Sequence, residues 1–124
     1  MITPEKKDLT IYQGVSFKKA WEIVDKEGNP IDLSGWSAFC HFRRRVKDED
    51  IILELSTANG LLFIDQDSEK TVYGISLPPE QTRTLSMKAA VYDINLVDPE
   101  GDKVRIQEGT ITISPAVTRV WEQE

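Results

Sequence analysis

Hydrophobic and polar residues alternate along much of the chain, most clearly in the segment Leu85 to Leu96 (LSMKAAVYDINL). Within it, Ala90, Tyr92, Ile94 and Leu96 share one parity, and the positions between them are more polar. A period of two residues is typical of a β-strand with one buried face. The segment is therefore predicted to lie in the middle of an antiparallel sheet.

The same alternation predicts further strands, and clusters of turn-forming residues separate them. DKEGNP (25–30) and Asn59-Gly60 are examples of such turns, which recur at intervals of roughly 8 to 12 residues. Only PPEQTRTL (78–85) has helical character, because proline suits a first helical turn and Glu80 suits a helix N-terminus. Strands are predicted at residues 8–12, 15–24, 36–46, 51–56, 61–65, 71–77, 89–97 and 103–114.

This succession of short strands predicts an all-β fold. We expect an immunoglobulin-like antiparallel β-sandwich of seven to nine strands, with one short helical turn near 78–85; a small closed barrel is the alternative. Residues 1–7 are predicted to form an extended N-terminal arm, 8–114 a single sandwich domain, and 115–124 a C-terminal interaction tail.

The last predicted strand, 103–114, changes parity along its length. Its apolar positions are even at first (Val104, Ile106) and odd later (Ile111). A change of parity requires one extra residue, so a β-bulge is predicted near Glu108-Gly109.

Tyr92 has two interpretations. It follows Leu85 by seven residues, a spacing similar to the tyrosine corner of immunoglobulin-like sandwiches, in which the phenol bonds to backbone just upstream. Alternatively, Tyr92 is simply a core aromatic on a strand. Lys19 shares the parity of Phe17 and Trp21, and we expect its stem to lie along the sheet while its ammonium reaches water.

Composition narrows the class of protein. The chain has 124 residues, 40% of them hydrophobic, with a net charge of −6 and a pI near 4.8. An acidic chain is a poor match for nucleic-acid phosphates. No apolar run approaches the roughly 20 residues that span a bilayer, and the N-terminus lacks a signal core, so no membrane is expected. A single cysteine permits no internal disulfide.

The search for catalytic residues predicts no enzyme, no cofactor and no metal. Cys40 and His41 are adjacent on a predicted strand and therefore point to opposite faces. The acidic loops 48–50, 65–67 and 98–102 lack the calcium-loop pattern and are interpreted as solvated turns. Alternation also splits Arg43-Arg44-Arg45, which reads either as a solubilising strand end or as a contact with an acidic partner.

Three longer phrases carry a family resemblance: DLTIYQGVSF (8–17), DKEGNPIDLSGWSAFCHFR (25–43) and YDINLVDPEGDKVRIQEGTITISPAVTR (92–119). In order and spacing they resemble small bacteriophage structural proteins and fibre or baseplate modules, and are similar to the N-terminal sandwich of phage baseplate upper proteins. The resemblance implies a non-enzymatic, immunoglobulin-like module of the virion, made in the bacterial host cytoplasm. It leaves open a head decoration or cement protein and a tail or baseplate accessory.

The partners that the resemblance implies are other coat or tail subunits, in a homo-oligomer or a hetero-assembly. Trp121 is the strongest candidate contact, because a tryptophan near a polar chain end is typical of an interface anchor; alternatively it folds back on its own sandwich. The full set of predicted contact residues is Ile2, Pro4, Arg43, Arg45, Val117, Val120 and Trp121.

A second functional hypothesis is a carbohydrate-binding sandwich for host-surface adhesion. In that case an exposed Trp36 or Tyr73 would stack on a sugar.

Overall fold

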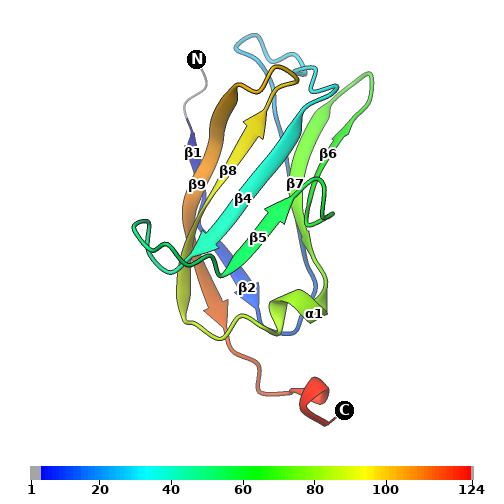
Figure 1. Cartoon of the computed structure of the whole chain (residues 1–124). Coiled ribbons are helices and arrows are strands. Elements are labelled where there is room, and N and C mark those ends of the chain that lie inside the picture. Colours follow the sequence, from blue (N-terminus) through cyan, green and yellow to red (C-terminus); the bar gives the residue numbers. More distant parts are fainter. Residues whose placement is uncertain (1–3, 124) are drawn as a thin grey trace.

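The computed structural model describes residues 4–123 as two β-sheets packed face to face, with one short helix at one end (Figure 1). Ile2, one of the predicted contact residues, lies outside the described residues. The elements in chain order are β1 (Glu5–Lys6), β2 (Leu9–Tyr12), β3 (Phe17–Glu22), β4 (Ser37–Arg43), β5 (Leu53–Ser56), β6 (Leu62–Gln66), β7 (Thr71–Leu77), α1 (Pro79–Thr82), β8 (Ala89–Val97), β9 (Lys103–Ser114) and the 3-10 helix η1 (Val120–Gln123).

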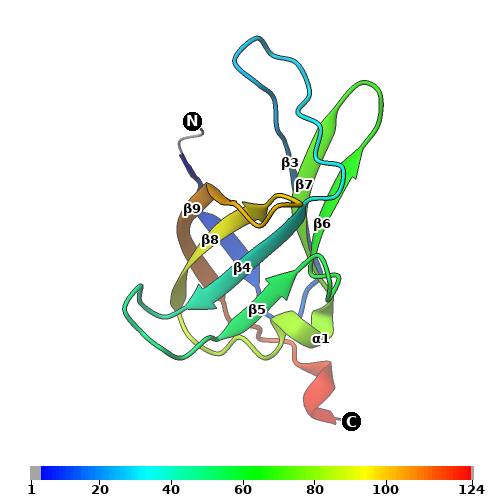
Figure 2. The same ribbon diagram turned by 45° about the horizontal axis from the view of Figure 1, so that its top comes forward.

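The larger sheet has the strand order β1-β9-β8-β4-β5, with β2 also paired to β9, and the smaller sheet has the order β3-β7-β6. Figure 2 shows the two layers from a second direction. The predicted all-β sandwich and its helical turn within 78–85 are confirmed. The sheets are not wholly antiparallel, because β1 and β2 run parallel to β9. Alternation in a sequence reveals a strand but not its direction.

The core lies between the sheets and follows the alternation of the central strands. On β8, the residues Ala90, Tyr92, Ile94 and Leu96 are all buried, as predicted. Their side chains meet those of the inner positions of β4, β7 and β9. Burial of this apolar surface is the main stabilising contribution to a sandwich of this size.

The bulge in β9 lies earlier than predicted. Ile94 pairs with Gln107, but the next residue, Asn95, pairs with Arg105, so Ile106 is the extra residue. As a result Ile106 and Gln107 are both buried. The prediction near Glu108-Gly109 was wrong because a polar residue such as Gln107 gives no sign in the sequence that it points inward.

Gln107 is the centre of a buried polar chain that joins the two sheets. The hydroxyl of Tyr73 on β7 donates a hydrogen bond of 2.7 Å to Gln107 Oε1, and Gln107 Nε2 donates one of 2.9 Å to the hydroxyl of Tyr92 on β8. The Tyr92 hydroxyl in turn donates to the carbonyl oxygen of Lys7 at 2.7 Å. Burial raises the pKa of Tyr92 to about 12 and also raises that of Tyr73, so both phenols stay protonated as donors.

Residues 5–7 are fixed beside β9 by this buried polar chain. Tyr92 does not form a tyrosine corner, because its hydroxyl bonds to Lys7, far upstream, rather than to the backbone just before β8. Lys7 O approaches β9 so closely that a Cβ on Gly109 would lie 2.2 Å from it. The larger sheet therefore begins at Glu5, within the stretch predicted as an arm.

A second polar link fixes the loop between β3 and β4. Gln66 on β6 donates to Asp32 Oδ1 at 2.9 Å and to Ser34 Oγ at 3.0 Å, and it accepts a bond from the Leu33 N–H. The bonds from Gln66 and Ser34 lower the pKa of Asp32 from 3.8 to about 2.

We expect Gln107→Leu to destabilise the protein by about 1–3 kcal/mol, because it leaves the buried Tyr73 hydroxyl without an acceptor. The double variant Tyr73→Phe, Gln107→Leu should lose less free energy of unfolding than the two single variants lose together, since it removes both partners of that bond. Urea denaturation measures both effects. An unchanged midpoint for Gln107→Leu would contradict the role of the buried polar chain.

Asp32 makes the free energy of unfolding depend on pH. Its folded-state pKa is below its ordinary value, so its ionised form stabilises the fold above pH 3.8, and this contribution is lost as the pH falls towards 2. Gln66→Ala should raise the pKa of Asp32 more than Ser34→Ala does. NMR titration of the Asp32 carboxyl carbon tests this, and equal shifts in the two variants would contradict the dominant role of Gln66.

Candidate functional site

The end of the sandwich from which the tail leaves carries most of the exposed apolar side chains. We call it the docking end: loops 13–16 and 44–52, the segment 78–88, and residues 115–123 (Figure 1). Among the described residues, six of the eight exposed large hydrophobic side chains lie there or at its border: Tyr12, Val15, Val46, Ile51, Val117 and Val120.

Three of the predicted contact residues come together at this end. Val117 is 93% exposed and Val120 is 61% exposed, whereas Trp121 is half-buried. These three residues help to line a depression of about 650 Å³, together with Tyr12 and Val15. Apolar groups clustered around one hollow are typical of a surface that contacts another protein.

Trp121 packs against its own domain, which is the alternative that the sequence left open. A Cβ on Gly14 would lie 2.3 Å from Cζ3 of the Trp121 ring, and Gly14 has a φ of +80°, where side chains are strained. The tail is thus seated on the turn after β2. Because it is seated, Val117 and Val120 project from a defined position.

Hydrogen bonds hold the segments of the docking end together. Gln13 Nε2 donates to the Arg83 carbonyl at 3.2 Å, and Gln13 Oε1 accepts from the Ala116 N–H at 3.0 Å. The Thr82 hydroxyl donates to the Val15 carbonyl at 2.9 Å. One glutamine and one threonine therefore fix the turn, the helix and the start of the tail relative to one another.

The predicted residues Pro4, Arg43 and Arg45 do not join the tail. Pro4 precedes β1, which pairs near residue 107 of β9. Arg43 stabilises the loop that follows it, because its Nη1 donates hydrogen bonds to the carbonyls of Asp48 and Glu49 at 2.9 and 2.8 Å. Arg45 is exposed, and its Nε lies 3.6 Å from a carboxylate oxygen of Asp48.

Sequence reasoning missed Tyr12 and Val15 as members of this surface. Both belong to segments that were interpreted as core strands, with alternation as the only guide. Tyr12 is 58% exposed and Val15 is 55% exposed. Only the folded position of the tail shows that they border the same hollow as Val117.

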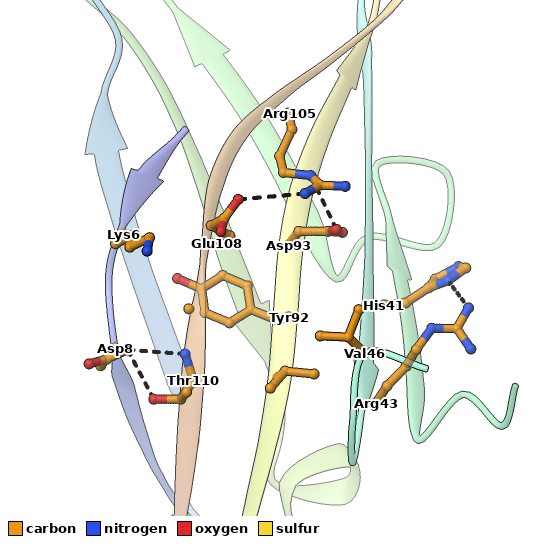
Figure 3. Close-up of a pocket in the computed structure, with 12 residues that line it drawn as sticks. Lys6, Asp8, His41, Arg43, Val46, Tyr92, Asp93, Arg105, Glu108 and Thr110 are labelled. Carbon is orange, nitrogen blue, oxygen red and sulfur yellow. Dashed lines mark hydrogen bonds and ion pairs between the residues drawn. The ribbon is translucent and has the colours of Figure 1, made fainter. Parts of the chain in front are cut away.

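A second hollow, of about 540 Å³, lies on the outer face of the larger sheet (Figure 3). Its charges largely pair with each other: Arg105 lies 3.4 Å from Asp93 and 3.6 Å from Glu108. Asp8 accepts bonds from the Thr110 N–H and hydroxyl, which lower its pKa. These carboxylates thus bind the side chains and backbone of β9.

His41 borders this hollow, and Cys40 lies beneath it in the core. Arg43 Nη2 lies 3.2 Å from His41 Nδ1, and His41 Nε2 lies 3.5 Å from a carboxylate oxygen of Glu54. Cys40 is buried, and burial raises its pKa. The two side chains point to opposite faces of β4, as predicted, which separates the thiol from the imidazole.

The loop 98–102 gathers three carboxylates, from Asp98, Glu100 and Asp102, whose ligand atoms lie within 4.8 Å of one another. Asp98 Oδ1 accepts the backbone N–H groups of the other two residues at 2.9 Å and so closes the loop on itself. The interpretation as a solvated turn stays a prediction.

The carbohydrate hypothesis required an exposed aromatic ring. Tyr73 cannot serve, because it is only 6% exposed and its hydroxyl bonds to Gln107. The prediction that Tyr73 could be exposed was wrong, since an inward parity and a buried partner place it in the core. Trp36 is half-buried and packs against the core.

Comparison with known proteins defines the class of fold. No family model and no curated protein matches the sequence. Among solved structures, the chain is similar to a chicken TCR with a TM-score of 0.50 and 11% identity; the match covers 93% of this chain and 56% of that one. The fold is therefore an immunoglobulin-like β-sandwich, as predicted. In residues 4–123, the helices are too short to cross a bilayer.

Gly14→Ala should loosen the tail, because the added methyl collides with Trp121. We expect trypsin cleavage after Arg119 to accelerate by about tenfold, the effect of losing roughly 1–2 kcal/mol of apolar contact. Gly101→Ala is the matched control, since Gly101 also has a positive φ (+96°) but no atom within 4 Å of an added Cβ. Equal cleavage rates in the two variants would contradict the seating of Trp121.

Proposed function

We propose that this protein is a non-enzymatic structural component of a bacteriophage virion, which binds neighbouring coat or tail subunits through its docking end. The phrases at 8–17, 25–43 and 92–119 suggest the kind of particle. The docking end suggests how the chain attaches to it.

The observation that carries the proposal is the difference between the two ends of the sandwich. The loops 23–36, 67–70 and 98–102 lie together at the end opposite the tail, which we call the acidic end (Figure 1). They contain eight carboxylates and two lysines, a net charge of −6, which equals the net charge of the whole chain. The carboxylates are Asp25, Glu27, Asp32, Asp67, Glu69, Asp98, Glu100 and Asp102.

The two ends therefore favour different surroundings. The loops of the acidic end carry a net charge of −6. The docking end has six basic and five acidic residues, so its charges nearly balance, and six large apolar side chains are exposed there or at its border. Removing apolar surface from water drives most protein association, and like charges oppose it. An orientation with the docking end against the particle and the acidic end in solvent follows from this difference.

The matched pair Val117→Asp and Val24→Asp tests the proposal. Val117 lies at the docking end and Val24 near the acidic end, and both are exposed. Val117→Asp should reduce binding to purified virions that lack the wild-type chain by at least about tenfold, measured by co-sedimentation, whereas Val24→Asp should bind like the wild type.

Thermal melting of both variants confirms that each remains folded. Equal binding by the two variants would contradict the assignment of the docking end. Quantitative mass spectrometry of purified virions tests whether the chain is a virion component. Absence of the wild-type chain from them would contradict that part of the proposal.

A further inference from the structure

Strand β3 is an edge of the smaller sheet that no other part of the described chain covers. β7 pairs with it on one side, and the sheet order β3-β7-β6 leaves its other side open. With six residues, β3 is the longest edge strand in residues 4–123. Four of its residues are exposed: Lys18, Lys19, Ala20 and Glu22.

The pairing with β7 shows which backbone groups are unpaired. The Ile23 N–H donates to the carbonyl of Thr71, its direct partner, at 2.9 Å. In an antiparallel pair such bonded positions recur every second residue, so the odd residues of β3 bond to β7. The N–H and C=O groups of Lys18, Ala20 and Glu22 therefore point away from the sheet.

The edge strand β5 of the other sheet is blocked, which distinguishes it from β3. Asn59 Oδ1 accepts the Ser56 N–H at 3.0 Å, and Asn59 Nδ2 donates to the Glu54 carbonyl at 3.0 Å. The amide of one side chain thus occupies the positions that a partner strand would take. β3 has no comparable cover in the described structure.

We propose that β3 pairs antiparallel with β3 of a second copy, around a two-fold axis at Ala20. In this register Ala20 lies opposite Ala20 of the second copy, and each Lys18 lies opposite Glu22 of the other copy. All three residues with outward N–H and C=O groups then exchange hydrogen bonds. The two small sheets join into one continuous sheet, a recognised mode of strand addition.

The charges of Lys18 and Glu22 favour this register. Neither Lys18 nor Glu22 has an ion-pair partner within residues 4–123; Lys18 lies over the Phe63 ring, 5.3 Å from its centre. Opposite charges placed directly across a strand pair stabilise it, and like charges destabilise it. Two-fold registers centred on Lys18 or Glu22 oppose like charges, as does one centred on Lys19.

Lys19 explains why the edge does not pair indiscriminately. It shares the inward parity of Phe17 and Trp21, and a lysine at such a position normally protects an edge strand from association. In the proposed register, Lys19 lies opposite Trp21 of the second copy, where the ammonium can contact the indole face. The register centred on Lys18 places Lys19 opposite Phe17 instead, and the register centred on Trp21 places it opposite Ile23.

Charge reversal tests the pairing, with sedimentation velocity over a concentration series as the measurement. The wild type should form a reversible dimer, and Lys18→Glu or Glu22→Lys alone should each raise the dimer dissociation constant by about tenfold or more. The double variant K18E/E22K restores opposite charges across the axis and should restore the dimer. Lys70→Glu, in the acidic-end loop 67–70, is the control and should dimerise like the wild type.

A cysteine at the axis tests the register itself. Ala20→Cys should form an intermolecular disulfide under mild oxidation, because directly opposed strand residues have Cα atoms about 5.5 Å apart. Ser16→Cys should not, since Ser16 lies away from the axis; Cys40 is buried and does not interfere. A monomeric wild type at all concentrations, or a dimer indifferent to both charge reversals, would overturn the proposal. These assays use the isolated chain, so they do not depend on attachment to a virion.

Discussion

The buried polar chain of Tyr73, Gln107, Tyr92 and the Lys7 carbonyl is the interaction on which the rest of this sandwich depends. It crosses the core from β7 in one sheet to β8 and β9 in the other, and ends on the backbone between β1 and β2. Every side-chain polar group in it has a partner, which is the condition under which buried polar groups specify one arrangement. The bulge at Ile106 makes this possible, because it turns Gln107 into the core.

This constraint also determines which surfaces stay open. Because Tyr92 and Gly109 hold residues 5–12 beside β9, the N-terminal strand cannot cover β3. β9 ends level with β2, where Ser114 pairs with Tyr12, and Gln13 and Gly14 seat the tail that follows on the docking end. The open edge at β3 and the seating of the tail on the docking end therefore both follow from the pairing of the N-terminal strands with β9.

Alternation along the sequence was sufficient to predict the sandwich and every strand except β1, because inward parity and burial coincide on strands such as β4 and β8. The short helical turn was predicted from its prolines and Glu80. It could not locate the bulge or the role of Tyr92, since both depend on a polar residue, Gln107, whose direction only the fold reveals. Val117, Val120 and Trp121 were predicted as contacts because apolar side chains near a polar chain end are typical of an interface, and the structure places all three at the docking end. Tyr12 and Val15 were missed because their neighbours in the tail are distant in sequence. Alternation also gave no sign that Arg43 bonds to the carbonyls of its own loop, and its role in a partner contact stays a prediction.

We propose that the two ends of this immunoglobulin-like module differ in function: the docking end attaches to a neighbouring subunit, and the acidic end faces solvent. Electron cryo-microscopy of virions that contain the chain tests it most directly. We expect density in which Val117 and Val120 are buried against a neighbouring subunit, while the loops 23–36, 67–70 and 98–102 face solvent. Density with these acidic loops against the particle and the tail free in solvent would contradict it.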